Sequence, residues 1–277
     1  IAERNVVGQN ALIGGELLLP GEIVLARGES YATPWLIATW GDGLDAAAAR
    51  IHGYLRSRPN HPATPRPVTF NAWEAVYFDH SLDRLLQLVA IAAEVGAERF
   101  VLDDGWFGAR SDDTAGLGDW VVSEEVWPDG LVPLAEAVHA SGMEFGLWFE
   151  PEMINLDSEA ARAHPEWIMS PRTHRPQEAR GQHVLDLTNP AAFAHVLGQI
   201  RQVLADTRVD FIKWDFNRDV YEAISPLTGR PAYHAQTLAT YRLMSTILAE
   251  HPGLEIESCA AGGGRVDLSI MELADRV

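Results

Sequence analysis

The spacing of apolar residues divides the chain near residue 66. Before residue 46, short apolar runs are separated by turn residues such as Pro20-Gly21, a pattern typical of β-strands. These runs are 11–19, 22–26 and 31–40. A helix is expected over 45–56, and the four prolines within 59–67 favour an extended connector. We predict the end of an all-β domain (1–45), a linker (46–66) and a second domain (67–277).

Beyond residue 66, short apolar runs alternate with stretches whose apolar residues recur at helical spacing. The predicted strands are 68–71, 99–102, 144–149, 183–187, 209–215 and 254–258. The predicted helices are 81–97 with Ser81 as N-cap, one closed by Gly142, 190–206 with Asn189 as N-cap, and 234–250. Alternation of this kind indicates a parallel sheet with helices outside it, in the α/β class.

Polar residues at the ends of five strands distinguish a closed barrel from an open doubly wound sheet. They are 73–74, 103–104, 148–150, 213–215 and 257–259. A barrel collects its active site from the carboxyl ends of many strands, and no Gly-x-Gly-x-x-Gly nucleotide loop follows the first strand. The sequence therefore predicts a (β/α)8 TIM barrel that is truncated in this chain.

The chain carries 39 acidic and 21 basic side chains, a formal net charge of −18. A nucleic-acid-binding surface needs clustered Lys and Arg, so that class of function is excluded and a neutral or small substrate is expected. No apolar run approaches the ~20 residues that cross a bilayer. The one cysteine cannot form an internal disulfide, and no Cys/His cluster has zinc spacing.

Lys213 and Asp215 give the sharpest chemical signal. Side chains alternate along a strand, so both point to the same face of the strand that 209–215 is expected to form. A cation two residues away favours the ionised carboxylate and lowers its pKa, which suits a nucleophile rather than a proton donor. The alternative is a structural ion pair in the barrel interior.

Asp103 and Asp104 place two carboxylates at the end of another strand. They can accept hydrogen bonds from two different hydroxyls, but paired aspartates also bind Mg²⁺ or Ca²⁺, and a helix N-cap is the structural alternative. Trp106, Trp120 and Trp148 offer flat apolar faces suited to sugar rings. We therefore favour a carbohydrate as the ligand.

Three further residues have weaker signals. Glu150 follows a strand and could serve as general acid or base, although a supporting role is preferred. Arg180 lies in a loop where most arginines are solvated, and Cys259 would ordinarily be a small buried apolar residue.

Five ordered segments resemble the bacterial α-galactosidases of glycoside hydrolase family 36. They are 71–75 (Asn-Ala-Trp-Glu-Ala), 102–108 (Leu-Asp-Asp-Gly-Trp-Phe-Gly), 146–153 (Gly-Leu-Trp-Phe-Glu-Pro-Glu-Met), 213–218 (Lys-Trp-Asp-Phe-Asn-Arg) and 257–265 (Glu-Ser-Cys-Ala-Ala-Gly-Gly-Gly-Arg). The resemblance implies a retaining hydrolase of terminal α-galactosyl residues, acting on melibiose- and raffinose-type sugars without metal or organic cofactor. It also implies that residues 1–45 end an N-terminal β-sandwich domain.

The resemblance assigns the central residues of the site. Asp215 corresponds to the nucleophile that forms a covalent galactosyl-enzyme, with Lys213 and Asn217 at the sugar-binding positions beside it. Asp103 and Asp104 correspond to the carboxylates that hold the galactose 4- and 6-hydroxyls.

Four more residues complete the implied substrate pocket. Trp148 corresponds to a pocket wall and Arg180 to a substrate-contacting arginine, while Cys259 and Gly262 correspond to the wall near the 2-hydroxyl. The family's acid/base aspartate lies in a Ser-Asp-Asn-Thr-Asp stretch, which this chain does not contain. Because retaining cleavage needs two carboxyl groups, we expect these residues to be an inactive fragment of a longer enzyme. The fragment ends at Val277, on what is expected to be the start of a strand.

Two alternatives stay open. The same fold would suit a raffinose-type galactosyltransferase or an α-N-acetylgalactosaminidase, and an intact pocket without a proton donor would suit a non-catalytic galactose-binding protein. The resemblance also implies a homo-oligomer, namely a tetramer. With one cysteine and no visible leader, a cytoplasmic location is expected, with no nucleic-acid or membrane partner.

Overall fold

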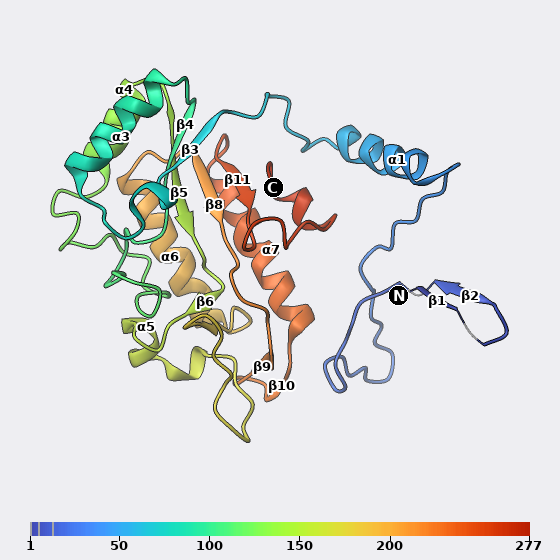
Figure 1. Cartoon of the computed structure of the whole chain (residues 1–277). Coiled ribbons are helices and arrows are strands. Elements are labelled where there is room, and N and C mark those ends of the chain that lie inside the picture. Colours follow the sequence, from blue (N-terminus) through green and yellow to red (C-terminus); the bar gives the residue numbers. More distant parts are fainter. Residues whose placement is uncertain (1, 5, 13) are drawn as a thin grey trace. The chain divides into compact units, whose positions relative to one another are not determined.

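The computed structural model describes residues 2–4, 6–12 and 14–277 (Figure 1). The chain separates into two compact units, Ile1–His61 and Pro62–Val277. Three residues inside the predicted all-β region, Ile1, Asn5 and Ile13, lie outside the described residues. The assignment of the first unit to the end of a β-sandwich domain stays a prediction.

The N-terminal unit contains one short hairpin and one helix. Strand β1 (Ala2–Arg4) pairs antiparallel with β2 (Asn10–Leu12), and helix α1 spans Leu44–Ser57, close to the predicted 45–56. In the described part of the chain, 22–26 and 31–40 form no strand, contrary to the prediction. A strand needs a neighbour to pair with its backbone groups, and apolar residues such as Trp35 stay exposed here.

A five-stranded parallel sheet forms the centre of the second unit (Figure 1). Its strands are β3 (Thr69–Asn71), β4 (Arg99–Leu102), β5 (Glu144–Phe149), β8 (Phe211–Trp214) and β11 (Glu255–Ser258). They lie side by side in the order in which they occur along the chain. A doubly wound sheet reverses its strand order at a switch point, whereas a barrel adds strands in sequence, so this order fits the predicted barrel.

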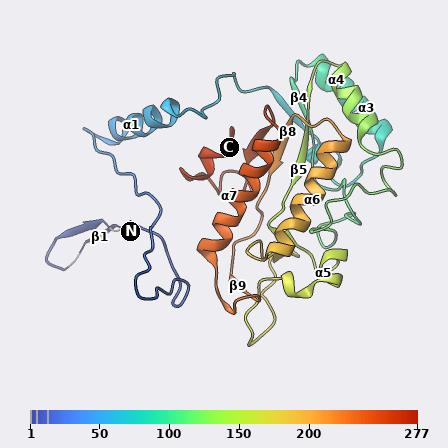
Figure 2. The same cartoon turned by 180° about the vertical axis from the view of Figure 1, so that it is seen from behind.

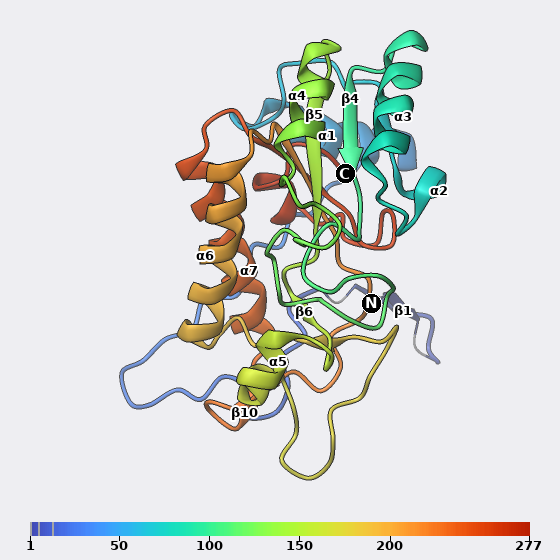
Figure 3. The same ribbon diagram turned by 90° about the vertical axis from the view of Figure 1, so that its left-hand side faces the viewer.

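Helices connect these strands, as the alternating pattern predicts. They are α2 (Trp73–Val76), α3 (Leu82–Glu94), α4 (Val132–Ala140), α5 (Glu159–Ala163), α6 (Pro190–Asp206) and α7 (Tyr233–Glu250), with 3-10 turns at Pro165–Trp167 and Ile270–Glu272. Helices α3 and α4 pack against each other, and so do α6 and α7 (Figures 2 and 3). The Asn189 side chain accepts a bond from the Ala191 amide as an N-cap, but Ser81 makes no such cap bond.

One predicted strand lies outside the central sheet. Instead of a parallel strand over 183–187, the structure has β7 (His183–Val184), which pairs antiparallel with β6 (Met153–Ile154). The adjacent Leu185 amide bonds the Glu152 carbonyl at 2.9 Å. These pairings hold the segment beyond the carboxyl end of β5, so it contributes to the rim of the sheet. A second two-residue pair, β9 (Ile224–Ser225) and β10 (Arg230–Pro231), follows β8.

The strands pack closely around Gly146 because this residue has no side chain. A Cβ added to Gly146 of β5 would lie 2.8 Å from both the Phe211 ring and a Val101 methyl group. Beneath them, Arg99 is 2% exposed and binds Glu255 of β11 at 2.7 Å. At the end of the chain, Arg276 forms a parallel bridge beside β11. Strands distant in sequence are thus joined by packing and by a buried ion pair.

Candidate active site

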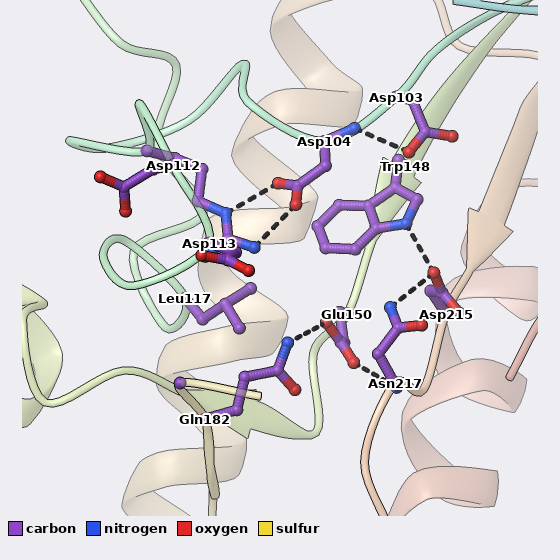
Figure 4. Close-up of polar contacts among 12 residues, drawn as sticks. Asp103, Asp104, Asp112, Asp113, Leu117, Trp148, Glu150, Gln182, Asp215 and Asn217 are labelled. Carbon is purple, nitrogen blue, oxygen red and sulfur yellow. Dashed lines mark hydrogen bonds and ion pairs between the residues drawn. The ribbon is translucent and has the colours of Figure 1, made fainter. Parts of the chain in front are cut away.

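The carboxyl ends of β4, β5 and β8 bring the predicted site residues together (Figure 4). Asp103 and Asp104 follow β4, Trp148 lies in β5, and Asp215 follows β8. Because adjacent parallel strands end at the same edge, residues more than a hundred positions apart become neighbours.

Asp215 is 5% exposed and points toward Trp148 and Asn217 (Figure 4). Its Oδ2 accepts hydrogen bonds from Trp148 Nε1 at 3.0 Å and from Asn217 Nδ2 at 2.7 Å, and its Oδ1 accepts one from the Phe216 amide at 2.8 Å. Burial raises the pKa of Asp215, but these donors and the Cys259 thiol outweigh burial and bring the pKa below its ordinary value. The side chain is therefore an anion near neutral pH.

Lys213 does not pair with Asp215 as the sequence suggested. Its Nζ lies 2.7 Å from Oδ2 of Asp103, which follows β4, the second strand away from β8 in the sheet. Burial lowers the pKa of Lys213, but the charge of Asp103 outweighs it and the pKa is raised. Hydrogen bonds from neutral donors, rather than the lysine, are thus the main cause of the low pKa of Asp215.

Asp103 and Asp104 have separate partners. Besides Lys213, Asp103 accepts a bond from Asn71 Nδ2 at 2.5 Å. Asp104 accepts two hydrogen bonds from the guanidinium of Arg110, with Nε and Nη2 at 2.8 and 2.7 Å from its two oxygens. Burial raises the pKa of Asp104 in spite of the arginine. Each carboxylate has about four acceptor positions, so both keep capacity for a ligand hydroxyl.

Arg180 reaches the site through Asn217. Its Nη1 donates to Asn217 Oδ1 at 3.0 Å and to the Asn217 carbonyl at 3.2 Å. The Asn217 amide donates to Glu150, whose other oxygen accepts a bond from Gln182 Nε2 at 3.0 Å. Glu150 is fully buried, and burial together with the charge of Asp215 raises its pKa to about 8.

Cys259 lies beside the carboxylate and Gly262 continues its loop. Burial and the charge of Asp215 raise the pKa of the Cys259 thiol to about 11, so it is a neutral donor to that aspartate. Gly262 has φ of +95°, which favours glycine, and its carbonyl accepts a bond from the Ala260 amide at 2.8 Å. A Cβ at Gly262 would have no neighbour within 4 Å.

All three tryptophans predicted to stack on a sugar ring are buried in the core. Trp106 and Trp120 are fully buried and pack against Phe107 and Phe149. Trp148 is 2% exposed, and its Nε1 faces Asp215. The tryptophans therefore belong to the packed core beside the site. Of the three, only Trp148 bonds one of the site's carboxylates.

Among residues 2–4, 6–12 and 14–277, no group of three or more His, Cys, Asp and Glu side chains could hold a metal ion. Asp104, which the sequence left open as a metal ligand, has the guanidinium of Arg110 against both oxygens. The site offers an anionic carboxylate, a lysine–aspartate pair and hydrogen-bond donors, which suits a polyhydroxylated ligand. In the described part of the chain, no helix is long and apolar enough to cross a membrane.

The sequence did not reveal several residues that complete the site. Arg110 lies in a long irregular segment and Asn155 in the short link between β6 and α5, where a single polar residue gives no periodic signal. Gln182 sits in a loop, and its role depends on a fold that brings it to Glu150. Among these residues, only Glu150 could be proposed from the sequence, because it follows a predicted strand.

Comparison with known proteins identifies the family. The Melibiase family model matches residues 30–277. An α-galactosidase of Escherichia coli is 41% identical over 279 aligned residues, covering 99% of this chain and 39% of that protein.

Solved structures agree with the sequence relatives. The GH36 α-galactosidase AgaB of Geobacillus stearothermophilus superposes with a TM-score of 0.78 at 37% identity, covering 84% of this chain and 33% of that one. Variants of AgaA from the same organism, solved with stachyose and with raffinose, superpose with a TM-score of 0.77 at 36% identity, covering 84% of this chain and 33% of theirs. The chain thus spans well under half the length of these relatives. The α/β barrel fold is confirmed, and the chain belongs to the Melibiase family of α-galactosidases.

Proposed function

We propose that the protein containing this chain is a retaining α-galactosidase that uses Asp215 as its nucleophile. The observation that carries the proposal is the environment of Asp215, an ionised carboxylate held by Trp148, Asn217 and the Phe216 amide. Family membership supports the activity.

In the proposed reaction, an Asp215 oxygen attacks the anomeric carbon of a terminal α-galactosyl residue. The bond to the leaving oxygen breaks, and that oxygen receives a proton from an acid outside these 277 residues. Water then releases galactose from the covalent intermediate with overall retention of configuration. The donors on Asp215 keep it ionised before attack, and Asn217 is itself oriented by Arg180 and Glu150.

The proposed substrates are melibiose and raffinose-type oligosaccharides. Support comes from the AgaA structures with stachyose and raffinose. Asp103 and Asp104 are proposed to accept bonds from the 4- and 6-hydroxyls, with Lys213 donating beside them. Cys259 and Gly262 are proposed to border the 2-hydroxyl, where an acetamido group would need additional space. We further propose a cytoplasmic homo-oligomer with residues 67–277 in its catalytic barrel.

Hydrolysis of an aryl α-galactoside by the full-length protein tests this function. Asp215→Asn should lower kcat by at least about 10³-fold, because the nucleophile is lost while its shape is kept. The matched control is Asp83→Asn, an exposed aspartate on α3. Proton NMR should show the α-anomer of galactose as first product, and longer sugars would indicate transfer instead. Binding of galactose without hydrolysis of the galactoside would show that the protein is a galactose-binding protein instead of an enzyme.

A further inference from the structure

Arg110 is a buried cation that touches the proposed substrate-binding carboxylate Asp104. It is 4% exposed, and its Nε and Nη2 form two parallel bonds to the Asp104 oxygens. Such a bidentate pair fixes the plane of the carboxylate as well as its charge. The orientation of Asp104 therefore depends on this arginine.

The other edge of the guanidinium forms hydrogen bonds with nearby residues. Nη1 donates to the Ala115 carbonyl at 2.9 Å and to Asn155 Oδ1 at 3.2 Å. The backbone of Arg110 also lies against Gly116, where an added Cβ would be 3.1 Å from the Arg110 nitrogen and 3.2 Å from its Cα. Four of the five N–H groups of the guanidinium are thus bonded, so Arg110 has little freedom to rotate.

Asn155 joins this anchor to the loop that carries Arg180. It is fully buried, and its Oδ1 also accepts a bond from the Leu117 amide at 2.7 Å. Its Nδ2 donates to the Gly181 carbonyl at 2.7 Å. Arg180, the residue before that glycine, bonds Asn217.

A continuous set of hydrogen bonds consequently connects Asp104 with Asp215. It runs through Arg110, Asn155, the 180–181 backbone and Asn217. Figure 4 shows that these two carboxylates lie on opposite sides of Trp148. Asp104 and Asp215, which are proposed to contact one sugar ring at different atoms, are thus linked by the same set of bonds.

We propose that Arg110 is a positioning residue that aims Asp104 at one hydroxyl of the sugar. The inference rests on the proposed function, because it assigns Asp104 to substrate binding. Arg110 uses about two of the four acceptor positions of the carboxylate and leaves the others for the ligand. It does not touch the sugar itself, so its effect passes through Asp104.

Two variants of the full-length protein test this role. Arg110→Lys keeps the charge but loses the bidentate geometry, and Arg110→Met removes both. For 4-nitrophenyl α-galactoside, kcat/KM should fall roughly 10²-fold in the methionine variant, the scale of a misplaced contact group, and less in the lysine variant. Arg162→Lys is the matched control, since that arginine is exposed on α5 and also binds two acidic side chains, Asp157 and Glu159.

Substrate analogues separate positioning from simple loss of stability. The 4-deoxy and 6-deoxy galactosides each lack one candidate hydroxyl. With the analogue that lacks the hydroxyl bound by Asp104, Arg110→Met should reduce kcat/KM less than about threefold relative to wild type, since the contact is already gone. Equal losses on all three substrates, or no loss on the galactoside, would overturn the proposal.

Two controls keep the result interpretable. Arg110→Gln retains a side-chain donor and replaces either variant that does not fold, as judged by circular dichroism, and should show the same dependence on the analogue. If the wild-type protein itself does not hydrolyse the galactoside, the proposed function fails. If wild type is active and the Arg110 variants lose activity without regard to the hydroxyls, only the positioning role fails.

Discussion

Glu150→Gln should change how the stability of the protein depends on pH. The Glu150 carboxyl is fully buried, and burial together with the charge of Asp215 raises its pKa from 4.5 to about 8. A carboxyl with a raised folded-state pKa contributes stability that is complete below the unfolded pKa and is lost as pH rises through the folded pKa. The wild-type protein should therefore lose stability between pH 4.5 and 8.

The size of the effect follows from the pKa interval. A difference of roughly 3.5 units at 1.36 kcal/mol per unit gives about 5 kcal/mol for the whole range, and about 3 kcal/mol by pH 7. Glutamine does not ionise, but its NH2 group replaces one acceptor of the bonds from Gln182 and Asn217, at a cost of about 1 kcal/mol. The variant should be less stable than wild type near pH 4.5 and more stable by about 2 kcal/mol at pH 7.

Urea unfolding of the full-length protein between pH 4.5 and 8.5, followed by tryptophan fluorescence, measures this difference. Glu94→Gln, at an exposed position of α3, is the matched control for the same substitution away from the site. A Glu150→Gln difference that stays constant between pH 4.5 and 8.5 would contradict this prediction. It would show that the pKa of Glu150 in the folded protein lies near its ordinary value of 4.5.

Two further predictions concern the sheet. Gly146→Ala should lower the free energy of unfolding by about 1–3 kcal/mol, because its Cβ would meet Phe211 and Val101 at 2.8 Å; a urea-unfolding difference near zero would show that the strands separate easily. Arg99→Met should cost about 1–3 kcal/mol in the same assay, because Glu144 and Glu255 lose this buried partner while Glu255 keeps Arg276, and Glu255→Gln in that background should recover part of the loss. A variant as stable as wild type would show that the ion pair contributes no net stability.

Much of the sheet could be predicted because its strands have simple signals. Residues 99–102 and 144–149 are apolar runs bounded by turns, and both form strands with those bounds. The run 183–187 has the same pattern, yet it pairs antiparallel at the rim, because strand pairing depends on neighbours that the local sequence does not encode. The same argument applies to 31–40, which has no pairing strand among the described residues.

The residues of the site could be predicted better than the hydrogen bonds and ion pairs between them. Asp103 and Asp215 could be placed from strand ends alone. Lys213 bonds Asp103 rather than Asp215 on its own strand, and this depends on the geometry of the sheet, in which β5 separates β8 from β4. Arg110 was overlooked because a buried arginine in an irregular loop looks like a solvated one until its partner is known.

The residue that becomes covalently modified by a galactosyl donor identifies the nucleophile. The full-length protein would be incubated with a fluorinated α-galactosyl donor whose glycosyl-enzyme hydrolyses slowly, then digested and analysed by mass spectrometry. We expect one galactosyl ester in the wild-type protein, on the peptide that contains Asp215, and no ester in the Asp215→Asn variant. A stable adduct on another carboxylate, such as Glu150 or Asp104, would contradict this expectation.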